Sequence, residues 1–427
     1  MLQVPFIRAN QDTVITGLQK KRFANAAEAV AEVLRLDEER RTTQFTLDAQ
    51  LAEQNTASKQ IGQLMREGKK DEAEAAKGKV QELKESSKTL QEKLQESEHA
   101  LTQLLYTLPN IPHEKVPQGS TAEDNAVEEE NGTIPLLHSE AKPHWELIQE
   151  YDLIDFELGN KITGAGFPVY KGKGARLQRA LINFFLDEAI AAGYTEYIPP
   201  HLVNEASGYG TGQLPDKEGQ MYHATADNLY LIPTAEVPIT NIFRDVILKE
   251  DEFPVKCVAY TPCFRREAGS WGAHVRGLNR LHQFDKVEIV QIAHPDNSYA
   301  ILEEMRAHAV SLLKKLKLPY RVLNLCGGDM GFTAALTYDL EVWSAAQERW
   351  LEVSSVSNFE TYQSNRLKLR YKPTEGKGNQ LAHTLNGSAL ALPRILAAIL
   401  ENNQTETGIE IPEVLQSYCG FSRIEKN

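Results

Sequence analysis

Cysteine is scarce in this chain of 427 residues, which contains Cys257, Cys263, Cys326 and Cys419. These residues form no CxxC pair, and no spacing of cysteine and histidine suits a zinc ion. The longest apolar runs, such as residues 395–400, are far shorter than the roughly 20 residues that a membrane span needs. Residues 1–11 also lack the apolar core of a secretory signal. We therefore expect a reduced, cytoplasmic protein that has no structural zinc and does not span a membrane.

Positive charge is also in short supply. The chain has 46 lysine and arginine residues against 59 aspartate and glutamate residues, a net charge of −13. A diffuse attraction for nucleic acid is therefore not expected, and a nucleic-acid partner would need a local basic patch. The glycine-rich phosphate loops GxxxxGK(S/T) and GxGxxG after a strand are missing as well. Any phosphate group must therefore be bound by side chains.

What the sequence does contain, first, is a helical hairpin. Residues 27–108 have the pattern of two long helices, and the break at Glu67-Gly68-Lys69 is so short that the second helix must run antiparallel to the first. Spacings of three and four alternate along both helices, as in a coiled coil. In the first helix the predicted seam is Leu47, Leu51, Gln54, Ser58, Ile61 and Met65. In the second helix it is Ala73, Ala76, Val80, Leu83, Ser87, Leu90, Leu94, Ser97, Leu101, Leu104 and Leu108. At ~1.5 Å of rise per residue, such a hairpin is on the order of 60 Å long.

The tip of the predicted hairpin is locally basic. Between residues 59 and 79 there are six basic and four acidic residues, in a chain whose net charge is −13. The basic residues are Lys59, Arg66, Lys69, Lys70, Lys77 and Lys79. Taken alone, such charges favour a solvated coiled-coil surface or a dimerisation rod over a binding site.

Beyond the hairpin the composition changes twice. Residues 111–135 contain Pro112, Pro117, Gly119 and the acidic cluster 128–130, which is typical of a solvated linker. Further on, a helix is predicted at 175–192, and strands are predicted near 194–198, 228–232, 255–260, 281–292 and 350–355. Because strands dominate and do not alternate regularly with helices, we predict an α+β domain with an antiparallel sheet flanked by helices, not a Rossmann fold. The predicted domains are therefore a hairpin domain at 1–110, a linker at 111–135 and a second domain at 136–427.

Three clusters in the second domain carry residues suited to phosphate chemistry. The first runs from Phe264 to Ser270 and continues through a glycine-containing loop to Glu288, which indicates two strands joined by a long loop. It offers the arginines Arg265, Arg266, Arg276 and Arg280. The planar fork of arginine matches phosphate oxygens better than any other side chain. For this segment alone, a surface hairpin with salt bridges is the alternative interpretation.

The other two clusters are shorter. In Glu352-Val353-Ser354-Ser355, a carboxylate and a hydroxyl three residues later can share a Mg²⁺ ion that also contacts phosphate. In the segment from Asn386 to Arg394, an arginine stands at the start of the following helix, where free N–H groups already favour anions. Taken alone, the first of these patterns is weak, and the second is better explained by a capped core helix.

In combination and in this order, the clusters resemble the signature motifs of class II aminoacyl-tRNA synthetases, and their details are similar to the bacterial-type seryl-tRNA synthetases. The resemblance covers nearly the whole chain, through the hairpin and five segments: Thr234 to Pro238, Phe264 to Ser270, His282 to Glu288, Glu352 to Asn358 and Asn386 to Arg394. It implies an enzyme that activates L-serine with ATP to seryl-adenylate and transfers serine to the 3′ end of serine tRNA. Selenocysteine tRNA is a further candidate partner.

The resemblance also implies roles for single residues in an ATP site. Arg265 would bind the α-phosphate, and Arg280 and Arg394 would bind the outer phosphates. Phe284 would stack on the adenine ring, and Glu267 would bind the adenine amino group or lie near it. Glu352 and Ser355 would coordinate Mg²⁺, with ATP as the substrate. The rest of the implied ATP site is Arg266, Val353 and Ser354.

A serine pocket and two macromolecular interfaces are implied in the same way. The implied serine pocket consists of Thr234, Ala235, Glu236, Arg265, Glu288 and Ser388. The six basic residues of the hairpin tip would contact phosphates of the tRNA. A homodimer is implied because the helix and strand before Pro199-Pro200 resemble the class II dimerisation motif. The hairpin of one subunit would then serve the active site of the other.

Two positions depart from the family pattern. Pro393 precedes Arg394, where many relatives have glycine, but proline is tolerated at a helix start, so we expect Arg394 to stay in place. Ala273-His274 replaces a basic-acidic pair that is common in the family, in a loop that approaches the tRNA acceptor end in relatives. This second departure bears on tRNA contacts and not on the ATP site.

Two other functions compete with this interpretation. One is a non-catalytic paralogue that acts as an RNA-binding or coiled-coil scaffold protein, against which the intact Arg265, Glu267, Glu352, Ser355 and Arg394 speak. The other is a synthetase-like ligase that loads an amino acid onto a carrier protein. The long hairpin speaks against that ligase. By the resemblance, the hairpin would bind the long variable arm of serine tRNA, and a carrier protein has no such arm.

Overall fold

The computed structural model describes residues 1–216, 218–267 and 275–425, and these divide into two units. The first unit consists of residues 2–19 and 23–109, and the second of Met1, residues 20–22 and the chain from Asn110 onwards. All four cysteines are buried and free. Among the described residues, no helix combines the length and apolarity required to cross a membrane.

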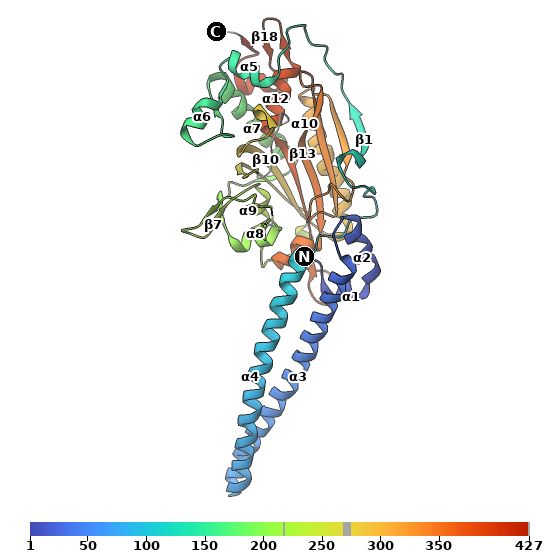
Figure 1. The fold of residues 1–427 in the computed structure, drawn as a ribbon, viewed down its shortest axis with the longest axis vertical. Helices are drawn as coiled ribbons and strands as arrows, with labels where there is room; N and C mark the ends of the chain where they lie inside the picture. The colour runs from blue at the N-terminus through green and yellow to red at the C-terminus, as the bar shows by residue number, and fades with distance from the viewer. Residues whose placement is uncertain (217, 268–274, 426–427) are drawn as a thin grey trace. The chain divides into compact units, whose positions relative to one another are not determined.

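The first unit is built from helices: α1 (Val4–Ala9), α2 (Gln11–Lys20), α3 (Ala26–Arg66) and α4 (Lys70–Thr107). The two long helices α3 and α4 form the predicted antiparallel hairpin (Figure 1). Gly68, with a φ of 77°, lies in the reversal between them, where a residue without a Cβ is least strained. At the other end of α3, the buried carboxylate of Asp37 pairs with Arg8 of α1 and, at 3.0 Å, with Arg40.

The predicted coiled-coil seam is right in α4 and half wrong in α3. Every predicted seam position of α4 is buried or partly buried. In α3, Leu51 and Met65 are 42% and 52% exposed, and Ser58 is exposed as well. Ala57 is buried and Leu64 is partly buried in their place. Alternation of three and four is satisfied by either phase, and the apolar character of Leu51 and Met65 favoured the wrong one.

The second unit is organised around one large sheet. Among the described residues it has eight strands, in the order β1-β11-β12-β13-β16-β10-β9-β4. Their bounds are β1 Ala126–Asn131, β4 Thr195–Glu196, β9 Val255–Phe264, β10 Gln283–Ala293, β11 Tyr320–Asn324, β12 Leu336–Ser344, β13 Arg349–Glu360 and β16 His383–Ala391. All neighbours are antiparallel except β4 and β9. The predicted antiparallel sheet is confirmed, although the strand predicted at 194–198 shrinks to the two residues of β4.

The acidic cluster of the predicted linker is a strand and not a solvated coil. Residues 126–131 form β1, which pairs with β11 at the edge of the sheet. Glu129 accepts the hydroxyl hydrogen of Tyr320 at 2.5 Å, and Glu128 accepts an N–H of Asn324 at 3.2 Å. An edge strand can carry charged side chains because one of its sides stays in water. Composition alone therefore misassigned this segment.

Helices cover the sheet and complete the core. They are α5 (His144–Glu150), α6 (Phe156–Ile162), α7 (Gly172–Ala191), α8 (Glu205–Thr211), α9 (Glu236–Asn241), α10 (Ser298–Lys315), α11 (Thr361–Leu367), α12 (Leu392–Asn402) and α13 (Glu413–Cys419). The predicted helix at 175–192 is confirmed as α7. Helix α12 is buried along nearly its whole length and packs on β10, β12 and β13, so the arginine near its start is rigidly placed.

Short strands make the remaining small sheets. They are β2 (Ile154–Asp155), β3 (Val169–Tyr170), β5 (Leu202–Asn204), β6 (His223–Ala224), β7 (Leu229–Leu231), β8 (Ile247–Lys249), β14 (Arg370–Lys372), β15 (Gln380–Leu381), β17 (Gln404–Thr405), β18 (Gly408–Glu410) and β19 (Arg423–Glu425). The strand predicted near 228–232 is β7. It pairs with β5 and β6 in a separate three-stranded sheet and does not join the main sheet.

Candidate active site

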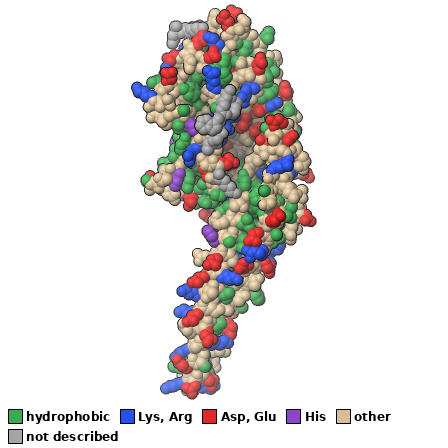
Figure 2. All heavy atoms as spheres, in the orientation of Figure 1, with side chains coloured by type: hydrophobic (Ala, Val, Ile, Leu, Met, Phe, Trp, Pro, Cys, Tyr) green, Lys and Arg blue, Asp and Glu red, His purple; other side chains and the backbone are tan. Residues whose placement is uncertain are grey.

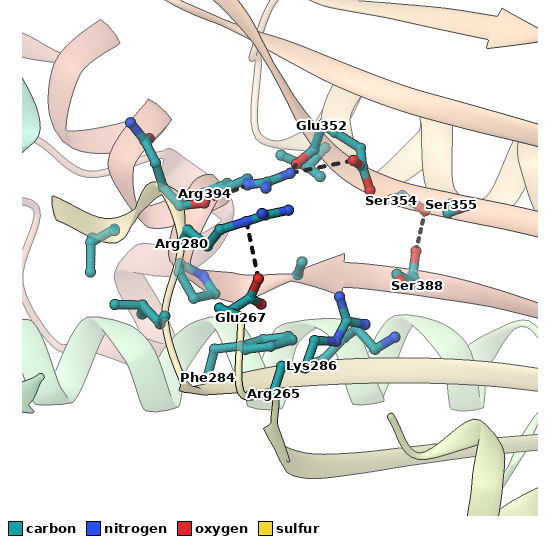
Figure 3. A pocket seen from close by; sticks show the side chains of 16 residues that line it. Arg265, Glu267, Arg280, Phe284, Lys286, Glu352, Ser354, Ser355, Ser388 and Arg394 are labelled. Atoms are coloured by element: carbon teal, nitrogen blue, oxygen red, sulfur yellow. Dashed lines mark hydrogen bonds and ion pairs between the residues drawn. The ribbon is translucent and has the colours of Figure 1, made fainter. Parts of the chain in front are cut away.

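A cavity of about 170 Å³ opens where β9, β10, β13 and β16 meet the start of α12 (Figure 3). Its walls bring together residues from all three sequence clusters. These are Arg265, Glu267, Arg280, Phe284, Glu352, Val353, Ser354, Ser355 and Arg394. The antiparallel pairing of β9 with β10 and of β13 with β16 places these distant segments side by side. We call this space the first cavity.

One side of the first cavity presents an arginine beside an aromatic ring. The guanidinium carbon of Arg265 lies 5.2 Å from the centre of the Phe284 ring. Arg265 is fixed by its Nε, which donates to the carbonyl oxygen of Pro233 at 3.3 Å, and by its backbone N–H, which donates to the carbonyl of His282 at 2.9 Å. A cation and a flat ring at this spacing suit a ligand that has both an anionic group and an aromatic base.

Two further arginines extend in the same direction along the first cavity, each beside a carboxylate (Figure 3). Arg280 lies 3.2 Å from Glu267, and Arg394 lies 3.5 Å from the carboxylate of Glu352. Arg394 also donates to the backbone oxygens of Asn279 at 3.0 Å and of Glu352 at 2.7 Å. Arg394 therefore keeps its place in the cavity wall even though Pro393 precedes it.

The acidic end of the first cavity fits a magnesium ion. Glu352 and Ser355 both line the cavity, and Asp339 of β12 is the Cα partner of Ser355 across the strand pair. Burial, and after it the negative charge of Glu352, raises the pKa of Asp339 well above its ordinary value. The Oδ1 atom of Asp339 has no hydrogen-bond partner among the described residues. Two acidic side chains, one of which has an unpartnered buried oxygen, and a hydroxyl form the kind of oxygen-donor set that Mg²⁺ prefers.

A second cavity of about 390 Å³ adjoins the first, because Arg265, Lys286, Ser355 and Ser388 line both. Its walls also contain Thr234, Glu236, Glu288, Asp339 and Asn386. The two spaces therefore share a boundary made of two cations and two hydroxyl groups. A ligand group placed at this boundary can react with a group held in the neighbouring cavity.

The second cavity is lined by side chains of both charge signs. Glu288 is 1% exposed, forms an ion pair with Lys286 and accepts an N–H of Asn386 at 3.1 Å. Glu236 accepts an N–H of Gln363 at 2.6 Å. Burial, with the charge of Glu288 as a smaller cause, raises the pKa of Glu236 to about 7. The second cavity therefore holds two buried carboxylates, Glu236 and Glu288, together with the cations Arg265 and Lys286. Both signs of charge in one small space suit a small zwitterion.

Some predicted site residues are not part of either cavity wall. Ala235 is 0% exposed and belongs to the hydrophobic core next to α9. Arg266 is exposed, and its backbone N–H donates to the carbonyl of Gln220. Arg265 and Arg266 are consecutive, and successive side chains of an extended chain point to opposite sides, so only one of them can face the cavity. Residues 268–270 and the departure Ala273-His274 lie outside the described residues.

Lys286, Asp339 and Gln363 are among the residues of the site that sequence reasoning missed. Lys286 and Asp339 line the cavities, and Gln363 binds Glu236 from behind. For Lys286 a signal was present, because it alternates with Phe284 and Glu288 along a strand and must share their face. Asp339 and Gln363 had no such signal, since their roles depend on pairing with β13 and packing against α9.

The six basic residues of the hairpin tip are all exposed, and acidic residues are interspersed with them (Figure 2). Lys69 pairs with Glu67 at 3.1 Å, Lys77 with Glu74 at 3.0 Å and Lys79 with Glu53 at 2.6 Å. Lys59, Arg66 and Lys70 complete the set. Ion pairs between exposed side chains contribute only ~0–1 kcal/mol, so a phosphate can compete for these lysines at little cost.

Comparisons with known proteins agree along the whole chain. A family model for the seryl-tRNA synthetase N-terminal domain matches residues 1–112, and one for the tRNA synthetase class II core domain (G, H, P, S and T) matches residues 221–403. A serine–tRNA ligase of Salinibacter ruber is 52% identical over 99% of both sequences, and one of Chlorobaculum parvum is 46% identical over 100% of both. The crystal structure of a seryl-tRNA synthetase from Pyrococcus horikoshii complexed with ATP matches with a TM-score of 0.93 and 32% identity, covering 100% of both chains.

Proposed function

The chain belongs to the seryl-tRNA synthetase family, and on this basis we propose how its residues activate L-serine with ATP and transfer serine to the 3′ end of serine tRNA. The observation that carries the proposal is the pair of adjoining cavities. One offers three arginines and an aromatic ring to a nucleoside triphosphate, and the other offers opposed charges to a small zwitterion. Arg265 and Lys286 stand at the boundary, where the two substrates must meet.

Activation joins a serine carboxylate oxygen to the α-phosphorus of ATP and breaks the bond to the leaving pyrophosphate. Negative charge grows on the phosphate oxygens in the transition state, and preorganised cations lower the barrier. In this proposal Arg265 binds the α-phosphate, and Arg280 and Arg394 bind the outer phosphates. Phe284 offers its ring to adenine. No side chain has to act as nucleophile or base, because the carboxylate of serine is already ionised.

Mg²⁺, when bound by Glu352 and Ser355 with Asp339 behind them, supplies positive charge to the phosphate oxygens. Asp339 faces Ser355 across the strand pair and orients its hydroxyl. Ser354 does not take part in this way, because its hydroxyl donates to the carbonyl of Ser388 at 2.6 Å.

Serine is selected by buried polar groups. In this proposal Glu236 binds the ammonium group and Glu288 binds the hydroxyl. Thr234 and Ser388 line the same cavity. An amino acid without the hydroxyl, such as alanine, would leave the buried carboxylate of Glu288 without that hydrogen bond, and a site of this kind can reject an analogue by up to ~10⁴-fold. The carboxylate of serine would face Arg265 and Lys286.

For the macromolecular partners we propose a tRNA-binding hairpin domain at 1–110, a connection at 111–135 and a catalytic domain at 136–427. The exposed tip cations would contact phosphates of serine tRNA, and selenocysteine tRNA is the second candidate. We also propose a cytoplasmic homodimer. Ile198 is 88% exposed and Leu202 is 45% exposed on either side of Pro199-Pro200, where the dimerisation motif is expected.

Amino-acid-dependent exchange of pyrophosphate into ATP, measured with Mg²⁺ over all twenty amino acids, tests the chemical step. Serine should support exchange, and no other amino acid should do so at a comparable rate. Exchange supported best by alanine, glycine or threonine would remove the assignment of serine. Exchange with no amino acid would favour a non-catalytic paralogue, which the intact arginine and carboxylate constellation disfavours.

A further inference from the structure

A buried hydrogen-bond network lies next to the first cavity and takes no part in the mechanism described so far. Its centre is the pair of His144 and Glu401, which are both 0% exposed. His144 is the first residue of α5, and Glu401 lies on α12, two helical turns after Arg394. The Nδ1 atom of His144 is 2.6 Å from Oε1 of Glu401. Neither residue lines the first or the second cavity.

The surrounding hydrogen bonds indicate which ring nitrogen of His144 carries the proton. The backbone N–H of Leu278 donates to Nε2 of His144 at 2.8 Å, so Nε2 carries no proton and Nδ1 donates to Glu401. Glu401 also accepts the backbone N–H of His144 at 2.9 Å, an N–H of Gln347 at 2.9 Å and the hydroxyl of Ser344. Glu401 therefore has four hydrogen-bond donors, which offset the cost of burying its side chain.

The network ends at the two arginines proposed to bind the outer phosphates. Leu278 and Asn279 belong to the short helix η4 (Gly277–Asn279), directly before Arg280. The side chain of Asn279 donates to Gln347 at 2.9 Å, and the backbone oxygen of Asn279 accepts from Nε of Arg394 at 3.0 Å. The segment that carries Arg280 and supports Arg394 is therefore held at Leu278 by His144 and at Asn279 by Gln347.

The backbone at this place is fitted closely to the imidazole. A Cβ atom on Gly277 would lie 2.4 Å from Nε2 of His144, and Gly277 has a φ of 65°, which side chains rarely adopt. Both facts require glycine here and bring η4 against the ring. The contact is independent of the hydrogen bonds and fixes the same segment.

We propose that His144 and Glu401 are positioning residues that preset Arg280 and Arg394 for the triphosphate of ATP, through the buried hydrogen bonds to η4 and Gln347. The inference rests on the proposed function for the identity of the phosphate ligand. The pair does not touch substrate. Because the pair holds the two arginines and their loop in place before ATP binds, less conformational entropy is lost on binding. Preorganisation of this kind raises affinity.

Two substitutions of His144 separate its two nitrogens. Glutamine can place an oxygen near the position of Nε2 and accept from Leu278, whereas asparagine is too short to reach it and leaves that buried N–H without an acceptor. We expect His144→Asn to raise the Kd and the KM for ATP at least about tenfold, as loss of one such buried hydrogen bond does. The KM for serine should stay within about twofold. His144→Gln should raise the ATP constants by no more than about threefold.

The measurements use the full chain with Mg²⁺: equilibrium dialysis of ATP without amino acid, serine-dependent pyrophosphate exchange with each substrate varied, and thermal unfolding. The matched control is His308→Asn, which changes another largely buried histidine, on α10. Should His144→Asn fail to fold, Gln347→Ala removes the bridge from Glu401 to Asn279 at a partly buried position, and we expect a rise of about threefold in the ATP constants alone.

An unchanged ATP Kd in His144→Asn, or in Gln347→Ala if the former does not fold, would overturn the inference. So would equal rises in the constants for ATP and serine, or equal behaviour of the glutamine and asparagine variants. The dialysis needs no amino acid, so this result is separate from the proposed function. A wild-type protein that binds ATP but exchanges pyrophosphate with no amino acid would refute that function and leave the positioning inference to be decided by the ATP Kd.

Discussion

Replacing Glu288 with glutamine tests whether this carboxylate binds the hydroxyl of serine. Glutamine keeps the size and one oxygen of the side chain but removes its charge. A hydrogen bond to a charged group contributes ~1.5–3 kcal/mol, and each 1.36 kcal/mol is a factor of ten in rate. The expected loss in kcat/KM for serine is therefore about 10- to 150-fold. The KM for ATP should change by less than about twofold, because Glu288 lines only the second cavity.

Glutamine is a sharper test than alanine at this position. Glu288 pairs with Lys286, and their side chains are 1% and 8% exposed. Removing one partner of a buried ion pair costs ~3–5 kcal/mol, because the other charge is left without compensation. Loss of activity in Glu288→Ala would therefore combine a lost substrate contact with partial unfolding. Glutamine still offers its oxygen to Lys286.

The assay is serine-dependent pyrophosphate exchange, with serine varied at saturating ATP and then ATP varied at saturating serine. Glu303→Gln is the matched control, because Glu303 accepts the hydroxyl of Tyr338 at 2.9 Å and lines neither cavity. A folded Glu288→Gln variant with an unchanged kcat/KM for serine would show that this carboxylate does not bind the substrate. An equal rise in both KM values would mean that the substitution disturbs the sheet and not one pocket.

Three further predictions concern the α-phosphate, the ammonium group and the hairpin. Arg265→Ala should lower kcat/KM for activation at least ~10²-fold with little change in melting temperature, and a rate near that of the wild type would exclude Arg265 from the α-phosphate. Because the pKa of Glu236 is raised to about 7, protonation should weaken serine binding, so kcat/KM for serine should rise with pH up to about 7 and then level off; a flat profile from pH 5.5 to 8 would contradict this role. Deleting residues 54–60 together with 74–80, one heptad from each helix, should leave activation within about twofold and sharply reduce charging of serine tRNA, whereas undiminished charging would make the hairpin a structural element.

The sheet was predictable from the sequence because its strands are long enough for their pattern to show. Strands β9, β10 and β13 each span ten residues or more and lie over the predicted runs. The short elements were less accessible. Strand β1 is acidic and was predicted as a linker. No feature of its own sequence indicates that its backbone pairs with β11. The phase of the seam in α3 was equally ambiguous, since it depends on which face α4 contacts.

For the candidate site, the sequence predicted best where a motif is local. Glu352 and Ser355 lie three residues apart in one strand, and both line the first cavity. Arg265 faces the first cavity and Arg266 does not, but the sequence alone does not show this. It depends on the direction in which the chain continues after β9. Asp339 needed the register of β12 against β13. Such information belongs to the pairing of strands and is not contained in any short segment.

Glu352 of the first cavity has a predicted role that differs from the contact it makes in the structure. The sequence pattern assigns Glu352 to Mg²⁺, whereas in the structure it lies 3.5 Å from Arg394. The side chains of Glu352 and Arg394 are 50% and 27% exposed, and a pair in such a position contributes only ~0–1 kcal/mol. A triphosphate would offer Arg394 several oxygens with more charge, so we expect it to displace Glu352 at little cost. The carboxylate would then be available to a cation on the same phosphate oxygens. Glu267 lies 3.2 Å from Arg280 in the same cavity, but its side chain is only 14% exposed. On the proposed function, the contact of Glu352 with Arg394 would precede its contact with Mg²⁺, and phosphate binding would couple the release of the carboxylate to its use as a metal ligand.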